Sequence, residues 1–277
     1  MNELAHADAR GIPVATDSDR CHRRVGDVGS CGKTGHPAMG RVEPHRIAQE
    51  VRRGLGTATD AEKQWVSDKR SDADFIKEMG IFGNFVHGTH VAGITADGNS
   101  GAKILSVKLI PTEVKPFVTD MISALSVKSD EDLRMRILKS TLAGLAKQQM
   151  LMMEEIAVYI DGHKADIANG SFGTGYGQAK TITNALFKVA YQREPNDEES
   201  DELVQHFLGE MISAGKKMVA SAPNTLFVFA AGNDGSNNDL SPTSPTNIQA
   251  DNVISVGATY KYEFLAPFSN YGEKMVD

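Results

Sequence analysis

The chain has 277 residues, of which 40% are apolar and 23% are charged, and its formal net charge is −7. This composition is typical of a globular protein, whereas a nucleic-acid-binding protein normally carries a basic face. The sequence shows no apolar run of membrane-spanning length, no apolar segment typical of a secretion signal, and only two cysteines. We therefore expect no nucleic-acid partner, no membrane span and no disulfide-rich scaffold.

The first sixty residues differ in composition from the rest of the chain. They contain eight of the twelve arginines, only one of the seventeen lysines, and none of the 18 aromatic residues. A segment without aromatic residues buries little apolar surface. We interpret residues 1–60 as poorly ordered or as a piece of different origin, with a solvated N-terminal extension as the alternative. Residues 61–277 then form the globular body.

Helical and extended patterns alternate along this body. Three- and four-residue apolar periodicity predicts helices, and alternating or continuous short apolar runs predict strands. The predicted helices are residues 86–96, 120–159, 178–191 and 201–220, with an acidic loop at 194–201. The predicted strands are residues 103–110, 165–169, 224–231 and 252–258.

This alternation predicts an α/β fold with a mostly parallel sheet and helices on both faces. The nearly continuous apolar run at residues 224–231 is typical of a strand that is covered on both faces. Ligand sites in such folds lie at the carboxyl ends of the strands. Two glycine-rich turns follow predicted strands, at residues 169–173 and 232–235.

The first motif with chemical meaning is HGTHVAG at residues 87–93. A histidine at the start of a helix is a candidate general base, because the positive helix end disfavours the charged ring. His87 and His90 are three residues apart without the zinc-binding HExxH pattern, so we predict no metal ligands here. Taken alone, such a pair is more often structural.

The second motif is AAGNDG at residues 230–235, directly after the predicted strand at 224–231. The carboxamide of Asn233, which follows Gly232, can donate a hydrogen bond to a developing oxyanion. In enzymes such a donor lowers the barrier by about 3–4 kcal/mol. Taken alone, the motif is more often an ordinary turn chosen for its backbone angles.

The third motif is NGSFG at residues 169–173, which follows the predicted strand at 165–169. An extended edge formed by Ser171, Phe172 and Gly173 can pair with a peptide backbone as an added strand. The alternative for this motif, too, is an ordinary turn.

In this order, the three motifs resemble those of the subtilase family, the subtilisin-like serine proteases of peptidase family S8. The later VISVGA and FSNYG segments match the family as well, so the resemblance spans residues 85–277. It implies a three-layer subtilisin-like fold that is truncated at the C-terminus. It also implies roles for six residues: His87 as general base, Asn233 as oxyanion donor, and Ser171, Phe172, Gly173 and Gly232 as substrate-binding residues.

The family's nucleophilic serine lies in a Gly-Thr-Ser block, and this sequence contains none. The resemblance places that block past residue 277, so we expect the chain to be inactive as it stands. The nearest match to the family's aspartate is Asp17. Pro13 interrupts the strand that should precede it, and Asp19 stands where the family has glycine.

Three functional hypotheses remain. The leading one is a serine endopeptidase that acts on peptide or protein substrates through an acyl-enzyme. The second is a non-catalytic peptide-binding remnant, and the third is the product of a decayed or chimeric gene. The resemblance also implies structural calcium, although no loop carries a clear ligand pattern. We expect a monomer, and the localisation stays open because relatives are mostly exported while no signal is visible.

Overall fold

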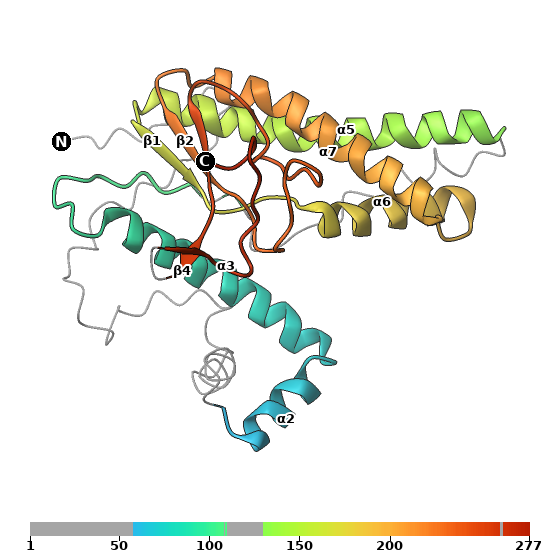
Figure 1. Ribbon diagram of the computed structural model, residues 1–277, viewed down its shortest axis with the longest axis horizontal. Coiled ribbons are helices and arrows are strands. Elements are labelled where there is room, and N and C mark those ends of the chain that lie inside the picture. Colours follow the sequence, from blue (N-terminus) through green and yellow to red (C-terminus); the bar gives the residue numbers. More distant parts are fainter. Residues whose placement is uncertain (1–57, 108, 110–129, 261–262) are drawn as a thin grey trace, which may run out of the picture. The chain divides into compact units, whose positions relative to one another are not determined.

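The computed structural model describes residues 58–107, 109, 130–260 and 263–277 (Figure 1). The chain divides into two compact units, residues 1–83 and 84–277. The described helices are α2 (Asp60–Lys69), α3 (Ala73–Ala96), α5 (Glu131–Gly162), α6 (Tyr176–Tyr191) and α7 (Asp197–Ala220). The described strands are β1 (Ile167–Gly170), β2 (Leu226–Ala230), β3 (Val253–Val256), β4 (Thr259–Tyr260) and β5 (Phe264–Leu265).

In the first unit, α2 leads into the first part of α3. Thr59 and Glu62 form a capping box, in which each side chain accepts a hydrogen bond from the other residue's backbone N–H. The Asp72 carboxylate accepts a bond from the N–H of Phe75 at 3.1 Å and so caps the start of α3. The rings of Trp65 and Phe75 meet edge to face with centroids 5.6 Å apart, which joins the two helices.

The second unit is built on a parallel three-stranded sheet in the order β1-β2-β3. Gly170 lies opposite Phe229, and Phe229 lies opposite Ser255. Because the strands are parallel, their carboxyl ends share one edge of the sheet. The chain returns from β1 to β2 through α6 and α7. The α/β class with a parallel sheet is confirmed.

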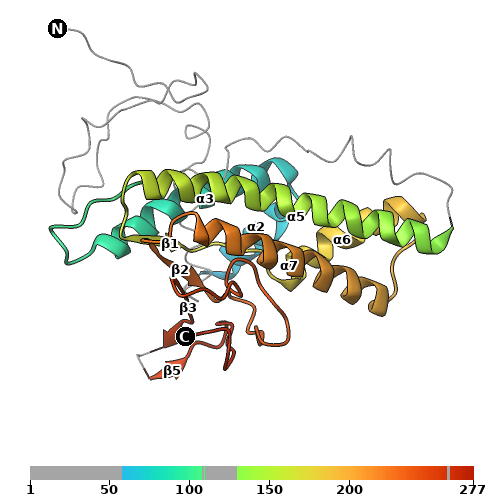
Figure 2. The same ribbon diagram turned by 90° about the horizontal axis from the view of Figure 1, so that it is seen from above.

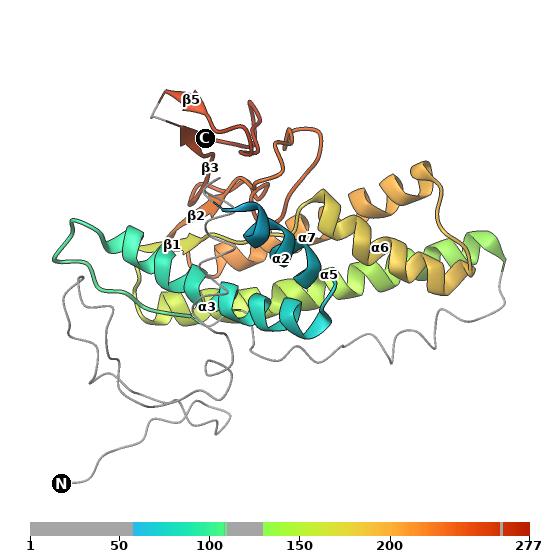
Figure 3. The same ribbon diagram turned by 90° about the horizontal axis from the view of Figure 1, so that it is seen from below.

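Helices α5 and α7 run side by side along one side of this sheet (Figure 2). Two ion pairs join the helices, Lys139 with Glu202 and Lys147 with Glu210. Because the later residue of α5 pairs with the later residue of α7, the two helices run in the same direction. Figure 3 shows α6 beside them. Apolar side chains from the three helices and β2 form one core: Leu138, Leu142, Phe187, Leu203, Phe207, Leu208, Met211, Phe227 and Phe229.

Helix α7 begins earlier than the sequence pattern indicates. The sequence pattern predicts a loop at residues 194–201, but α7 starts at Asp197. Asn196 and Glu199 form a capping box, with Asn196 Oδ1 accepting from the N–H of Glu199 at 2.8 Å. Acidic side chains in the first turn also favour a helix because they complement its positive end. The expectation of a loop from Asp197 onward is therefore wrong.

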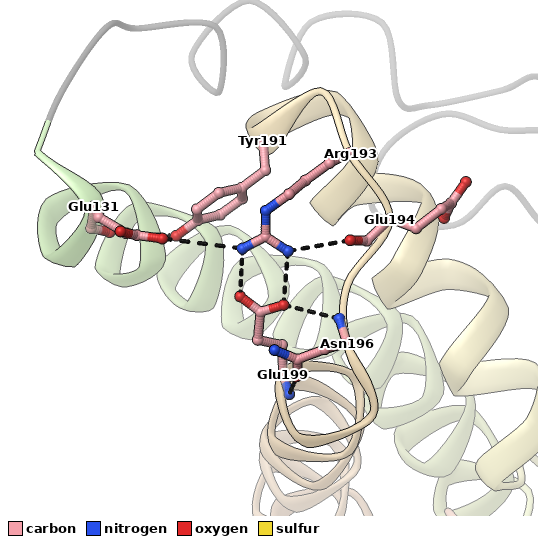
Figure 4. Close-up of polar contacts among 6 residues, drawn as sticks. All are labelled: Glu131, Tyr191, Arg193, Glu194, Asn196 and Glu199. Carbon is pink, nitrogen blue, oxygen red and sulfur yellow. Dashed lines mark hydrogen bonds and ion pairs between the residues drawn. The ribbon is translucent and has the colours of Figure 1, made fainter.

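Arg193, in the turn between α6 and α7, contacts residues at the start of α7 and at the start of α5 (Figure 4). Its guanidinium donates to both Glu199 oxygens, at 2.8 and 2.6 Å, and lies 3.9 Å from a carboxylate oxygen of Glu131. It also lies over the rings of Phe187 and Tyr191, at 4.9 and 5.4 Å from their centroids. One side chain therefore contacts all three helices.

The strand predicted at residues 103–110 does not form in residues 103–107, which are irregular. Residues 108 and 110 lie outside the described residues. Ile104, Leu105 and Val107 are exposed there. An alternating apolar pattern becomes a strand only when a neighbouring strand accepts its hydrogen bonds, and no described strand pairs with this segment.

The two faces of β2 differ. Phe227 and Phe229 lie in the core beneath the helices, whereas Val228 is half-buried and Ala230 is exposed. The sequence predicts that both faces of this strand are covered. Among the described residues, this is true only of the face that carries Phe227 and Phe229. None of the described helices combines the length and apolar character that crossing a membrane requires.

Candidate active site

The turn after β2 presents the carboxamide of Asn233. Gly232 has a φ of +117°, which is favourable only for glycine, and a Cβ there would lie 2.4 Å from Nδ2 of Asn270. Asn233 is exposed, and its side chain makes no hydrogen bond to any residue that the structure describes. Its N–H groups are therefore available to a ligand.

The segment after β1 presents backbone that no described residue pairs with. Within the described part of the chain, the backbone groups of residues 171–173 form no hydrogen bond. The Ser171 hydroxyl accepts a bond from Asn169 at 2.9 Å. Pairing resumes at Thr174, which exchanges backbone bonds of 2.7 and 3.1 Å with Ser244. Gly173 has no room for a side chain, because a Cβ would lie 2.9 Å from the Ser244 carbonyl.

These two segments lie next to each other because β1 and β2 are neighbouring parallel strands. A Cβ at Gly175 would lie 3.0 Å from the Asp234 carboxylate, so the chain after β1 touches the turn after β2. A cleft of about 220 Å³ opens between the strand ends. It is lined by Asn169, Ser171, Val228, Phe229, Ala230 and Val256. An amide donor beside free backbone is an arrangement that can bind an extended peptide.

His87 belongs to helix α3 and to neither of the two segments described above. Helix α3 starts at Ala73, so His87 lies well inside the helix and the argument from a helix start is wrong. His87 and His90 are both exposed. No hydrogen bond or ion pair among the described residues joins His87 to Asn233, and its role stays a prediction. Asp17 lies outside the described residues.

One tyrosine directly follows the segment after β1. Tyr176, the first residue of α6, donates from its hydroxyl to Asp201 at 2.9 Å. Burial raises the pKa of Tyr176, and the bond to Asp201 raises it further. Residues 58–107, 109, 130–260 and 263–277 contain no group of three or more His, Cys, Asp or Glu side chains that could hold a metal ion. Calcium binding stays a prediction.

Two asparagines at this edge were not identified from the sequence. Asn270 and Asn238 are almost fully buried, and both hydrogen-bond to the segment that carries Asn233. The sequence offered one signal, the FSNYG segment at residues 268–272. The sequence of this segment indicates only the family, because nothing local shows which turn Asn270 contacts.

Comparison with known families agrees with these motifs. The model of the subtilase family, Peptidase_S8, matches residues 53–277, which is most of the chain. No curated protein matches the chain.

Proposed function

The chain belongs to the subtilase family of serine endopeptidases, and we propose that it binds an extended peptide with Asn233 as oxyanion donor and His87 as general base. The observation that carries this proposal is that, among the described residues, neither the exposed Asn233 carboxamide nor the backbone of residues 171–173 has a hydrogen-bond partner, and that the segments that hold them touch at Gly175 and Asp234. The domain assignment is part of the proposal. Residues 1–60 are a distinct segment and residues 61–277 are the catalytic domain, although the family match starts at residue 53.

Each of these residues has one part in the proposed chemistry. The peptide pairs with the backbone of Ser171, Phe172 and Gly173, and Gly232 lets the turn approach it closely. When an oxygen nucleophile attacks the scissile carbonyl, negative charge develops on the carbonyl oxygen and Asn233 donates to it. His87 accepts the proton from the nucleophile and then gives it to the leaving amine.

The nucleophile itself is not identified in this sequence. Residues 1–277 contain no Gly-Thr-Ser block, and Asp17 is a weak match to the third member of the triad. We therefore infer that these 277 residues bind peptide without hydrolysing it. The unpaired backbone of residues 171–173 favours this peptide-binding reading over a product without function. We further propose that the chain binds as a monomer.

A titration with a fluorescein-labelled octapeptide tests binding by anisotropy. We expect saturable binding, and methylating one central amide nitrogen of the peptide should weaken it about tenfold by removing a strand-pairing donor. Methylation at the peptide's first nitrogen is the matched control and should change little. Asn233→Ala should weaken binding about threefold to tenfold. Absence of saturable binding, or equal effects of the two methylations, would overturn the proposal.

Two further measurements complete the test. Incubation of the purified chain with the same peptide should release no fragments in mass spectra. Cleavage that a fluorophosphonate abolishes would refute the inferred inactivity and reveal a nucleophilic serine within the 277 residues. Light scattering on the eluting protein should give the mass of one chain.

A further inference from the structure

Asn270 holds the turn that carries Asn233 from both sides. Its side-chain Oδ1 accepts hydrogen bonds from the backbone N–H of Asp234 at 2.8 Å and of Ser236 at 3.1 Å. Its own backbone N–H donates to the carbonyl of Gly232 at 2.9 Å. The backbone before and after Asn233 is therefore bound to a single residue from a later segment of the chain.

The Asn270 carboxamide is itself fixed in orientation. It is 1% exposed, and its Nδ2 donates to Oδ1 of Asn238 at 3.0 Å. Asn238 donates in turn to the Ala231 carbonyl at 2.9 Å, and its Oδ1 also accepts from Thr243 at 3.4 Å. Since a carboxamide has its acceptor on one side and its donor on the other, these partners allow one orientation of the Asn270 side chain.

This network holds the backbone from which the Asn233 carboxamide projects. Asn233 makes no side-chain bond among the described residues, so its position depends on the backbone of its turn. An oxyanion donor must lie within about 2.7–3.1 Å of the developing charge. A displacement of about 1 Å can cost about a hundredfold in rate. Rigid support of the turn therefore bears directly on function.

We propose that Asn270 is a positioning residue for the Asn233 carboxamide. It acts through the backbone N–H groups of Asp234 and Ser236 and does not touch the substrate. This proposal rests on the proposed function, in which Asn233 is the oxyanion donor. Asn238 supports Asn270 by fixing the orientation of its amide.

Nuclear magnetic resonance on the full chain tests the proposal without any peptide. The Asn233 side-chain signals are assigned from their loss in Asn233→Ala. In Asn270→Ala, we expect these signals to shift and the N–H groups of Asp234 and Ser236 to exchange with solvent at least tenfold faster, because their acceptor is gone. Unchanged signals and exchange rates in a folded Asn270→Ala variant would overturn the proposal.

Two variants separate positioning from general destabilisation. Asn270→Asp keeps an oxygen that accepts from the same two N–H groups, so the Asn233 signals should stay near their original positions. Asn252→Ala removes a carboxamide that holds the carbonyls of Val219, Ala222 and Thr225 elsewhere. It should lower stability and leave the Asn233 signals in place. Signals that move in proportion to lost stability in every variant would contradict a positioning role.

If Asn270→Ala does not fold, a second variant tests the proposal in its place. Asn238→Ala leaves Asn270 in place but removes the partner that orients its amide. We expect the same changes at Asp234 and Ser236, with exchange about threefold to tenfold faster. Unchanged exchange in this folded variant would count against the proposal.

The peptide titration distinguishes failure of this proposal from failure of the proposed function. If Asn233→Ala binds peptide as well as the original chain, Asn233 does not donate to the bound peptide, and its proposed part in peptide binding fails whatever Asn270 does. If Asn233→Ala weakens binding while Asn270→Ala leaves both binding and the Asn233 signals unchanged, only the positioning proposal fails. Loss of affinity in both variants supports both proposals.

Discussion

Arg193 and Glu199 form a two-armed ion pair across the turn between α6 and α7, with nitrogen–oxygen distances of 2.8 and 2.6 Å (Figure 4). One of the same carboxylate oxygens accepts from the N–H of Asn196 at 2.9 Å. Glu199 therefore caps α7 and anchors Arg193 at once. Charge-assisted, two-armed contacts of this kind fix geometry more firmly than single hydrogen bonds.

This pair predicts a loss of stability in acid. The bond to Arg193 lowers the pKa of Glu199 below its usual value of 4.5, with a smaller contribution from the Asn196 N–H. A carboxyl whose pKa is lower in the folded state stabilises the fold above its unfolded pKa and ceases to do so as the pH falls through its folded pKa. Urea unfolding followed by circular dichroism at pH 6 and pH 3 should show this decline.

The variant Glu199→Gln should be less stable at pH 6 and should lose less stability than the original chain on acidification. Its matched control is Glu198→Gln, because Glu198 is exposed in the same helical turn. The control should retain the full acid sensitivity. Equal pH profiles for the two variants would show that Glu199 does not carry the effect.

The helices of this region were predictable because their signals are local. Periodicity placed helices at residues 178–191 and 201–220, close to the observed α6 and α7. The predicted start of α7 is too late because a run of acidic residues is typical of a solvated loop, although this run begins with a capping box. Residues 103–107 have the alternating apolar and polar pattern that predicts a strand, but they are irregular in the structure. A strand also requires a neighbouring strand that forms hydrogen bonds with its backbone.

The candidate site was predictable only where its residues are consecutive. The turn with Gly232 and Asn233 follows a strand, as the sequence indicated. The bonds from this turn to Asn270 join segments separated by more than thirty residues. The sequence pattern carries no information on such long-range pairing, so the support of the turn could be found only in the structure.

The packing of α5 on α7 predicts a large difference between two leucines of α5. Leu142 is fully buried in the core, whereas Leu151 is 59% exposed. Leu142→Ala should lower the free energy of unfolding by about 2–5 kcal/mol, because it removes buried methyl groups and leaves a cavity. Leu151→Ala should change it by less than about 0.5 kcal/mol. Urea denaturation measures both, and similar losses would contradict the assigned core.

Two glycine-to-alanine substitutions should have opposite effects. Gly232→Ala forces a side chain into a φ of +117° and against Asn270, so we expect a loss of about 1–3 kcal/mol of stability. Gly209 lies in α7, is exposed and has open space around its Cβ position. Gly209→Ala should stabilise the helix by about 0.5–1 kcal/mol. Thermal unfolding distinguishes the two, and a neutral Gly232→Ala would mean that this turn is not constrained.

Asp239 should protect the backbone N–H groups of residues 272–277 from hydrogen exchange. Its carboxylate accepts hydrogen bonds from the backbone N–H groups of Glu273, Lys274 and Met275, at distances from 3.0 to 3.4 Å. Asp239→Ala leaves these groups without their acceptor, so hydrogen exchange measured by mass spectrometry should accelerate about tenfold or more in residues 272–277. Asp251→Ala, which changes an exposed aspartate, is the control and should leave this exchange unchanged. Equal protection in the two variants would mean that the segment is held by its other contacts, among them the pair of bonds between Asp277 and the backbone of Ser255.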